Sequence, residues 1–391
     1  MGSKKFLAVE GIRGVACLMV VLSHYSLAFF PYLHSFDDKA PDGNFQIQSF
    51  IHESPLGFFY SGTSAVFIFF VLSGFILTEI TKQASNRKLI ETCLKRYPRL
   101  MLPALCSCLF AFCLYKMAQP SSEYLTSWVN GFGNMELTLF GALYNGTVDV
   151  FFLSGKSDFN PVLWTMKIEL LGSFLIYFLC FNYSRNLVPF LSLGAFFLIV
   201  FLTKFRLIEL ELGFGLAAFI IGYAFSRKGV EVSFSVSISL LFVGLYFAGA
   251  HNGSWSYTGI YSLFGDYTYY YCNFVSGFFI VYAILFNKKI NVLFSSRAME
   301  NLGRLSFSIY LVHLPLLGII GVASFNIFYS YIGSYILSAI VASVTSMFIT
   351  YIVSEVFYEY VDNKGLRFSA ALSNLVLSYY STTKNIKKED V

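Results

Sequence analysis

The sequence has 391 residues, of which 56% are hydrophobic, 19% aromatic and only 13% charged. These few polar side chains cannot cover the surface of a water-soluble protein of this size. The composition therefore excludes an ordinary soluble protein and predicts an all-α integral membrane protein. The net charge of +5 comes from basic residues dispersed along the chain, which excludes nucleic acid as a partner. The seven cysteines lack the CxxC spacing of zinc sites, so we expect neither a bound metal nor disulfides.

Apolar stretches of about 20 residues, the length of a membrane-spanning helix, recur through most of the chain. They predict a polytopic bundle of about ten transmembrane helices, near residues 12–31, 58–79, 100–117, 161–182, 187–203, 208–226, 233–251, 270–287, 304–323 and 332–357. We expect one transmembrane domain to occupy residues 1–368. Residues 369–391 are then a cytoplasmic tail whose polar end is disordered.

Lysine and arginine are unevenly distributed between the segments that connect these helices. If the N-terminus is inside, the outer segments hold only Lys39, Lys116, Lys156, Lys204 and Arg206, and the other basic residues that lie between or beyond the spans are inside. The positive-inside rule therefore places both termini in the cytoplasm. Two outer segments are long, 32–57 and 118–160, and the apolar stretch 137–153 in the second is expected to lie at the interface or to re-enter the membrane.

Titratable side chains occur inside three predicted helices, where a charge costs about 2.5–3.5 kcal/mol and is therefore a functional hypothesis. In the first helix Arg13 and His24 are eleven residues apart, roughly 16 Å or three turns, so they share one face. The fourth helix holds Glu169, and the ninth holds Tyr310 and His313. We predict that His24, Glu169 and His313 reach similar depths and converge in one cavity.

The chemistry suited to such a set is general base catalysis. A neutral imidazole can take a proton from a hydroxyl as that hydroxyl attacks a thioester. We therefore predict His24 as the base, Glu169 as the group that orients it, and His313 as a further catalytic residue. Neither GxSxG nor HExxH occurs, which favours direct transfer without a serine intermediate, a metal or a tightly bound cofactor.

Five motifs follow one another along the chain: GIRGVACLMVVLSH with Arg13 and His24, FIFFVLSGFILT at 67–78, KRYPRLMLP with Arg96 and Arg99, LWTMKIE at 163–169, and SIYLVH at 308–313. In this order they resemble the motifs of the acyltransferase-3 family of membrane acyltransferases. That family includes inner-membrane enzymes that O-acetylate bacterial surface polysaccharides. Two positions depart from its pattern, because Leu170 replaces a second Glu and Val356 with Phe357 replaces a basic residue and proline after Glu355.

The resemblance implies an O-acyltransferase of the bacterial inner membrane. Such an enzyme moves an acyl group, usually from acetyl-CoA, to a hydroxyl of a surface glycan or lipid-linked sugar. Guanidinium groups at the inner mouth suit the phosphates of CoA through charge-assisted hydrogen bonds. The predicted substrate- and CoA-binding residues are Arg13, Lys95, Arg96, Arg99, Trp164 and Tyr310. The implied partners are acyl-CoA, a saccharide acceptor and membrane lipid, and a homo-oligomer is compatible with the sequence.

Two other functions remain open at this point. A proton-coupled transporter or flippase of a sugar-containing or anionic substrate also suits intramembrane His and Glu with a basic inner mouth. The sequence has no internal repeat, which weighs against inverted-repeat transporter folds. A nonenzymatic scaffold or receptor would not need titratable residues at matching depth in three helices.

Overall fold

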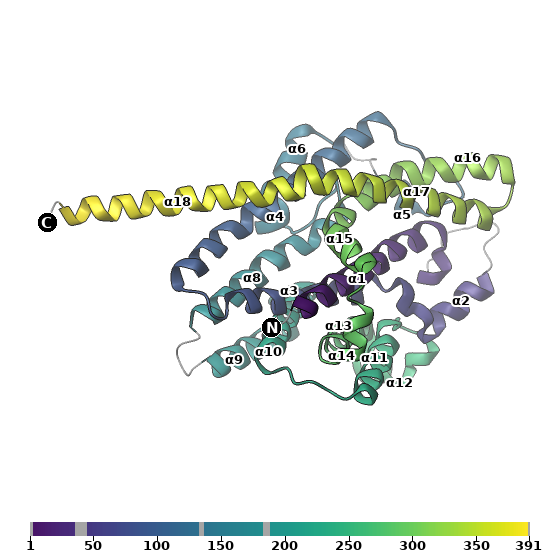
Figure 1. The fold of residues 1–391 in the computed structure, drawn as a ribbon. Coiled ribbons are helices and arrows are strands. Elements are labelled where there is room, and N and C mark those ends of the chain that lie inside the picture. The colour runs from purple at the N-terminus through teal and green to yellow at the C-terminus, as the bar shows by residue number, and fades with distance from the viewer. Residues whose placement is uncertain (1–2, 36–44, 133–136, 183–187, 390–391) are drawn as a thin grey trace.

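The computed structural model describes residues 3–35, 45–132, 137–182 and 188–389. These residues form helices joined by short connections, and no strand occurs among them. The predicted all-α fold is therefore confirmed. Figure 1 shows a bundle from which the last helix, α18 (Asn363–Glu389), projects. The predicted tail lies within this helix as far as Glu389.

Eight helical segments in the described part of the chain are long and apolar enough to cross a membrane. They contain α1 (Ser3–Phe29), α3 (Gly62–Thr81), α4 (Asn86–Met117), α8 (Thr165–Phe181), α10 (Leu210–Lys228), α13 (Thr268–Leu285), α15 (Arg297–Leu316) and α17 (Tyr335–Phe357). Two shorter apolar helices, α9 (Val188–Lys204) and α11 (Phe234–Ala248), coincide with the two remaining predicted spans. The chain is thus an integral membrane protein.

Short helices complete the chain between and after these spans. On the outer side by charge distribution lie η1 (Pro31–His34), α2 (Phe45–Glu53), η2 (Pro55–Tyr60), α5 (Ser127–Asn130), α6 (Leu139–Tyr144), η3 (Asn145–Asp149), α7 (Val150–Phe152), η4 (Pro161–Trp164), η5 (Trp255–Tyr257), α12 (Thr258–Phe264) and η6 (Gly265–Tyr267). The others are α14 (Lys288–Leu293), η7 (Leu317–Gly321), α16 (Val322–Ile332) and η8 (Tyr358–Asp362). Below, the inner end of the bundle is the end at which Arg13 lies.

Helix α4 begins earlier than the sequence predicts. Hydropathy places its start at residue 100, because the charged residues before that position interrupt the apolar stretch. The helix in fact starts at Asn86, where the side chain of Ser85 accepts a hydrogen bond from the backbone N–H of Lys88 and caps the first turn. Arg96 and Arg99 therefore lie roughly three turns inside a helix, and not in a connecting loop.

Helices α1 and α15 run parallel and in register. The thiol of Cys17 lies 3.2 Å from the carbonyl oxygen of Ser306, and the rings of His24 and His313 meet two turns further along. Both pairs are separated by 289 residues in the sequence. A constant offset arises only when two helices run side by side in the same direction. Each residue of α1 therefore lies next to the residue of α15 that is 289 positions later in the sequence.

Glycine permits this close approach at the inner end of the pair. A Cβ on Gly303 would collide with the carbonyl oxygen of Glu10, and a Cβ on Gly14 would lie 3.0 Å from the backbone nitrogen of Gly303. Small residues at such a crossing let two backbones touch within a membrane. This contact fixes the register that later brings the two histidines together.

The apolar stretch 137–153 does not form a further span. Its helices α6, η3 and α7 fold back along α4, so that a Cβ on Gly146 would lie 2.6 Å from the Cα of Leu105. The hydroxyl of Tyr97 donates a hydrogen bond to the carbonyl oxygen of Thr147 at 2.7 Å. The stretch therefore reaches the middle of α4, which corresponds to the re-entrant alternative.

Candidate functional site

A cavity of about 510 Å³ opens among α1, α3, α4, α8, α15 and the segment that follows α17. Helix α3 gives it an apolar wall, formed by Val66, Phe69, Phe70, Leu72, Ile76, Leu77 and Ile80. Four arginines also line it, namely Arg13, Arg96, Arg99 and Arg304, together with the acidic residues Glu10, Glu169, Glu300 and Asp362. Such a mixed wall suits a ligand that has both an apolar arm and anionic groups.

Arg96 is held by a dense set of polar contacts. Its Nη2 donates to Oε2 of Glu169 at 2.7 Å, and its Nε donates to the hydroxyl of Ser173 at 2.7 Å. The hydroxyl of Ser73 donates to the other carboxylate oxygen of Glu169 at 2.9 Å. Only 13% and 14% of the two charged side chains are exposed. Glu169 therefore orients the guanidinium group of Arg96, and not the imidazole of His24 as the sequence predicts.

Arg99 lies one turn further along α4, and its polar contacts differ from those of Arg96. Its side chain is exposed to the cavity. The carboxylate of Asp362 attracts it electrostatically, but no hydrogen bond or close ion pair joins it to another described residue. Arg13, in contrast, contacts Glu10 at 3.1 Å, and Arg304 contacts Glu355 at 3.2 Å. A guanidinium group whose N–H donors have no hydrogen-bonded protein partner, close to other positive charges, is a ready ligand for phosphate. Arg99 is therefore the strongest candidate for an anion-binding residue.

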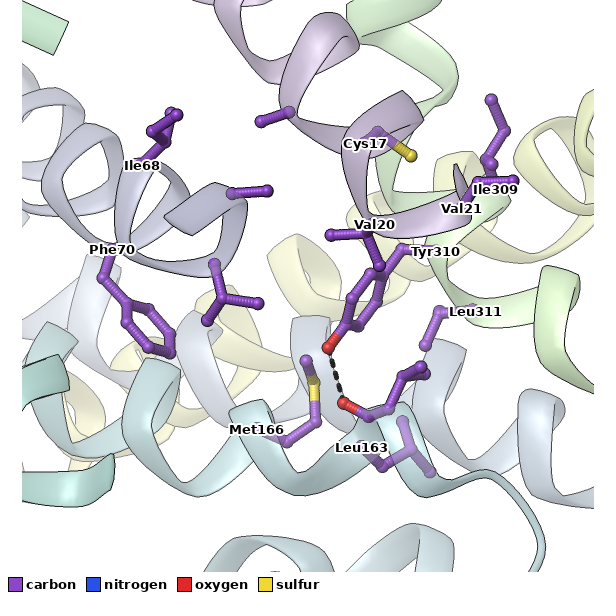
Figure 2. Packing of buried hydrophobic residues seen from close by; sticks show 14 of the residues in the cluster. Cys17, Val20, Val21, Ile68, Phe70, Leu163, Met166, Ile309, Tyr310 and Leu311 are labelled. Carbon is purple, nitrogen blue, oxygen red and sulfur yellow. Dashed lines mark hydrogen bonds between the residues drawn. The ribbon is translucent and has the colours of Figure 1, made fainter. Parts of the chain in front are cut away.

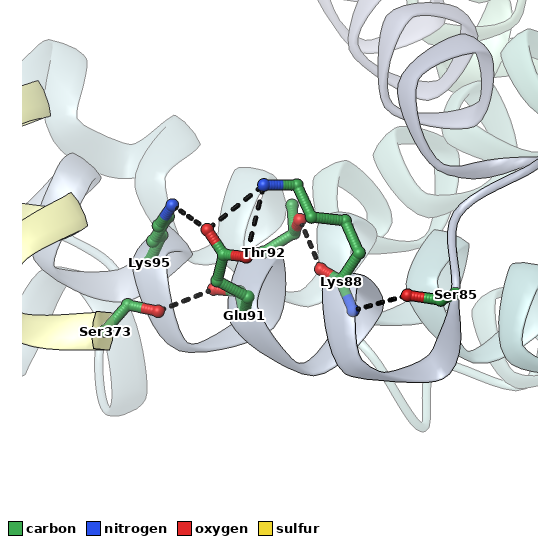
Figure 3. A network of polar contacts seen from close by, with 6 residues as sticks. All are labelled: Ser85, Lys88, Glu91, Thr92, Lys95 and Ser373. Atoms are coloured by element: carbon green, nitrogen blue, oxygen red, sulfur yellow. Dashed lines mark hydrogen bonds and ion pairs between the residues drawn. The ribbon is translucent and has the colours of Figure 1, made fainter. Parts of the chain in front are cut away.

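Lys95 and Trp164 lie outside this cavity, whose described lining contains neither. Lys95 forms an ion pair with Glu91, which also contacts Lys88, as Figure 3 shows. In the same network the hydroxyl of Ser373 donates to the carbonyl oxygen of Glu91 and ties α18 to α4. Trp164 packs edge-on against another aromatic ring of the core. The helical register of α4 explains why Lys95 lies outside the cavity that Arg96 lines, because adjacent residues of a helix point about 100° apart.

Tyr310 is the last residue of α15 that lines the cavity. Its hydroxyl donates to the carbonyl oxygen of Val162 at 2.6 Å and lies 3.1 Å from the hydroxyl oxygen of Thr165. Figure 2 shows the ring reaching from α15 to α8, beside Met166. His313 follows on the same helix, three residues or about 4.5 Å further along the axis. The cavity thus ends one turn short of the histidines.

His24 and His313 form a hydrogen-bonded pair. Nδ1 of His24 lies 2.9 Å from Nε2 of His313, and Nδ1 of His313 lies 3.0 Å from the carbonyl oxygen of Ile309. A carbonyl oxygen only accepts, so Nδ1 of His313 carries a proton, and its Nε2 accepts when the ring is neutral. Nδ1 of His24 must then be the donor. This leaves Nε2 of His24 unprotonated, which is the form that a general base requires.

Solvent exposure distinguishes the two rings. His313 is fully buried, whereas His24 keeps part of its surface exposed. The indole of Trp128 stacks on the imidazole of His24, with ring centroids 5.8 Å apart and planes within 7°. Nothing in the sequence points to Trp128, because it lies in a long outer segment with no spacing that relates it to the first helix.

The other three histidines gather at the outer end. The rings of His52 and His251 are 4.4 Å apart, and those of His34 and His251 are 6.5 Å apart. Burial, and secondly the neighbouring His52, lower the pKa of His34 to about 4 and that of His251 to about 3. The rings of His34 and His251 are therefore neutral near pH 7 and act as packing groups between outer segments.

The fold and the site together define a class: a polytopic all-α membrane protein with arginines and carboxylates around one inner cavity and a partly buried histidine pair next to it. The chain also matches the family model described as "Acyltransferase domain" over residues 6–355. It therefore belongs to the acyltransferase-3 family and is a membrane acyltransferase. No curated protein and no solved structure matches the chain significantly.

Proposed function

We propose that this acyltransferase moves an acyl group, with acetyl as the leading candidate, from cytoplasmic acyl-CoA to a saccharide hydroxyl at a bacterial inner membrane. The observation that carries the proposal is the hydrogen bond between His24 and His313, one turn beyond a cavity lined by arginines. It supports a base of defined tautomer at the end of a site for an anionic, elongated donor.

The cavity suits the donor in size and in charge. Its volume of about 510 Å³ lies within the usual range of roughly 300–1,000 Å³ for small-molecule sites. Arg99, together with Arg13 and Arg304, which line the same cavity, suits the phosphates of CoA. The apolar residues of α3 suit the pantetheine arm, which leads the thioester towards Tyr310. Arg96 and Glu169 hold each other and shape the wall.

His24 then performs the proton transfers of a direct acyl exchange. The acceptor oxygen attacks the thioester carbonyl carbon and gives its proton to Nε2 of His24. The tetrahedral intermediate collapses, the C–S bond breaks, and the departing sulfur takes that proton to form CoA. His313 accepts from Nδ1–H of His24 throughout, and this bond strengthens while His24 carries a positive charge. His313 is thus a positioning residue for the base.

The test uses the purified chain, radiolabelled acetyl-CoA and a detergent extract of lipid-linked saccharides. Free CoA and label in the saccharide are both followed. His24→Asn is the sharpest variant, because the amide N–H₂ still donates to His313 while the Nε2 atom is removed. We expect loss of transfer with unchanged acetyl-CoA binding in calorimetry.

His52→Asn is the matched control. His52 also donates through Nδ1, to the carbonyl oxygen of Leu33 at 2.9 Å, but it lies in the outer cluster. We expect normal transfer from this variant. Full transfer by His24→Asn would refute the role of His24, and transport of a saccharide without release of CoA would refute the enzyme itself.

A further inference from the structure

We infer that Trp128 is an acceptor-binding residue, and that its indole forms the wall against which the acceptor saccharide lies while a sugar hydroxyl reaches His24. The inference rests on the proposed function and names the part of the site that holds the second substrate. It starts from the observation that the segment which covers His24 comes from the outer side of the bundle.

The segment around α5 is firmly seated. The side-chain amide of Asn130 donates to the carbonyl oxygen of Ser122 at 2.7 Å and accepts from the backbone N–H of Ser122 at 3.0 Å. Leu125 and Val129 are buried beneath it. These contacts close residues 122–130 into a compact turn, so Trp128 is presented from a rigid support.

Contacts with α16 and η7 fix the position of this turn over His24. The side-chain amide of Asn326 donates to the carbonyl oxygen of Ser121 at 2.8 Å, and the rings of Tyr124 and Tyr329 are 4.6 Å apart. Phe132 closes on Gly318, where a Cβ would lie 2.9 Å from the phenyl ring. The position of the indole is therefore part of the fold.

The contacts around His24 leave the side that faces Trp128 for the acceptor. His313 occupies the Nδ1 side of the imidazole and is fully buried. The donor approaches from the inner cavity, which ends at Tyr310. His24 and Trp128 both remain partly exposed. The exposed surface next to the base is therefore bounded by the indole, on the outer side from which a glycan would arrive.

The chemistry of an indole suits a sugar. Its large apolar body complements the C–H face of a pyranose ring, and its N–H is a hydrogen-bond donor. No described residue accepts a hydrogen bond from the N–H of Trp128. A saccharide oxygen would satisfy this donor, whereas an apolar acceptor such as a lipid chain would not.

The experiment separates acceptor binding from base positioning. Labelled acetyl-CoA is supplied with and without the lipid-linked saccharide extract, and free acetate is measured when water is the only acceptor. In Trp128→Leu we expect the KM for saccharide to rise about tenfold, as for loss of one aromatic contact. The KM for acetyl-CoA and the hydrolysis that depends on His24 should stay near the wild-type values.

Two further variants keep the result clear. Trp128→Phe keeps an aromatic ring but loses the N–H, so it should show a smaller rise in KM and no saccharide-induced change in tryptophan emission. Trp255→Leu removes an outer tryptophan that is 64% exposed and should behave as wild type. An equal fall of transfer and hydrolysis in Trp128→Leu, or an emission change retained in Trp128→Phe, would overturn the inference. Failure of the proposed function would appear separately, as full activity of His24→Asn.

Discussion

The hydrogen bond between the two histidines makes replacement of His313 the most informative perturbation. His313 donates to the carbonyl oxygen of Ile309 and accepts from Nδ1 of His24. His313→Leu fills similar space but offers no acceptor. His313→Gln carries a carbonyl oxygen that reaches about as far as Nε2, so it can still accept from His24.

The expected fall in kcat follows from the loss of the buried hydrogen-bond acceptor that His313 offers to His24. A buried donor left without a partner costs about 1–3 kcal/mol. Since about 1.36 kcal/mol corresponds to a tenfold change in rate, His313→Leu should lower kcat by roughly 5- to 150-fold. His313→Gln should stay within about fivefold of wild type, because the net value of one hydrogen bond is about 1 kcal/mol.

The assay is release of CoA from acetyl-CoA in the presence of the saccharide extract, with kcat and KM determined for both variants. The KM for acetyl-CoA should not change, because His313 lies beyond the cavity that binds the donor. Thermal unfolding in detergent identifies any general loss of structure. If His313→Leu and His313→Gln were equally impaired, or if His313→Leu kept full activity, the tautomer argument would be refuted.

Three further outcomes are expected. Arg99→Ala should raise the KM for acetyl-CoA about tenfold or more, through the loss of a charge-assisted contact. The melting temperature should be unchanged, because no hydrogen bond or close ion pair joins this side chain to another described residue. Gly303→Leu should drive α1 away from α15 at Glu10 and lower the melting temperature, since overpacking typically costs about 1–3 kcal/mol. Acidification should destabilise the outer segments. The pKa values of His34 and His251 are lowered in the folded protein, to about 4 and about 3. As the pH falls from about 6.5 to 4, only the unfolded chain therefore takes up protons at these two histidines, and the folded state loses stability. Unfolding measured against pH should therefore show stability that is constant above pH 6.5 and falls below it, and His251→Asn should flatten that slope.

Local sequence signals were sufficient for the spans but not for the exact limits of α4. Apolar length identified the spans because the bilayer imposes a minimum helix length. The same criterion failed before residue 100, where charged residues lie inside a helix that continues to Asn86. Arg96 and Arg99 both line the inner cavity, whereas Lys95, next to Arg96 in the sequence, points to another face and pairs with Glu91. Side-chain direction follows helical register, which hydropathy does not define.

The sequence by itself determined that this chain is a helical membrane protein and that Arg13 and His24 share one face of the first helix, and its charge distribution predicts the orientation. These features depend on residues within one segment and on its contact with lipid and water. Only the tertiary structure decided that His313, 289 residues away, is the partner of His24, that Glu169 belongs to Arg96, and that Trp128 covers the base. Contacts between distant segments depend on how helices pack, and here that packing is set by glycines at the α1–α15 crossing and by an outer segment folded back over the bundle.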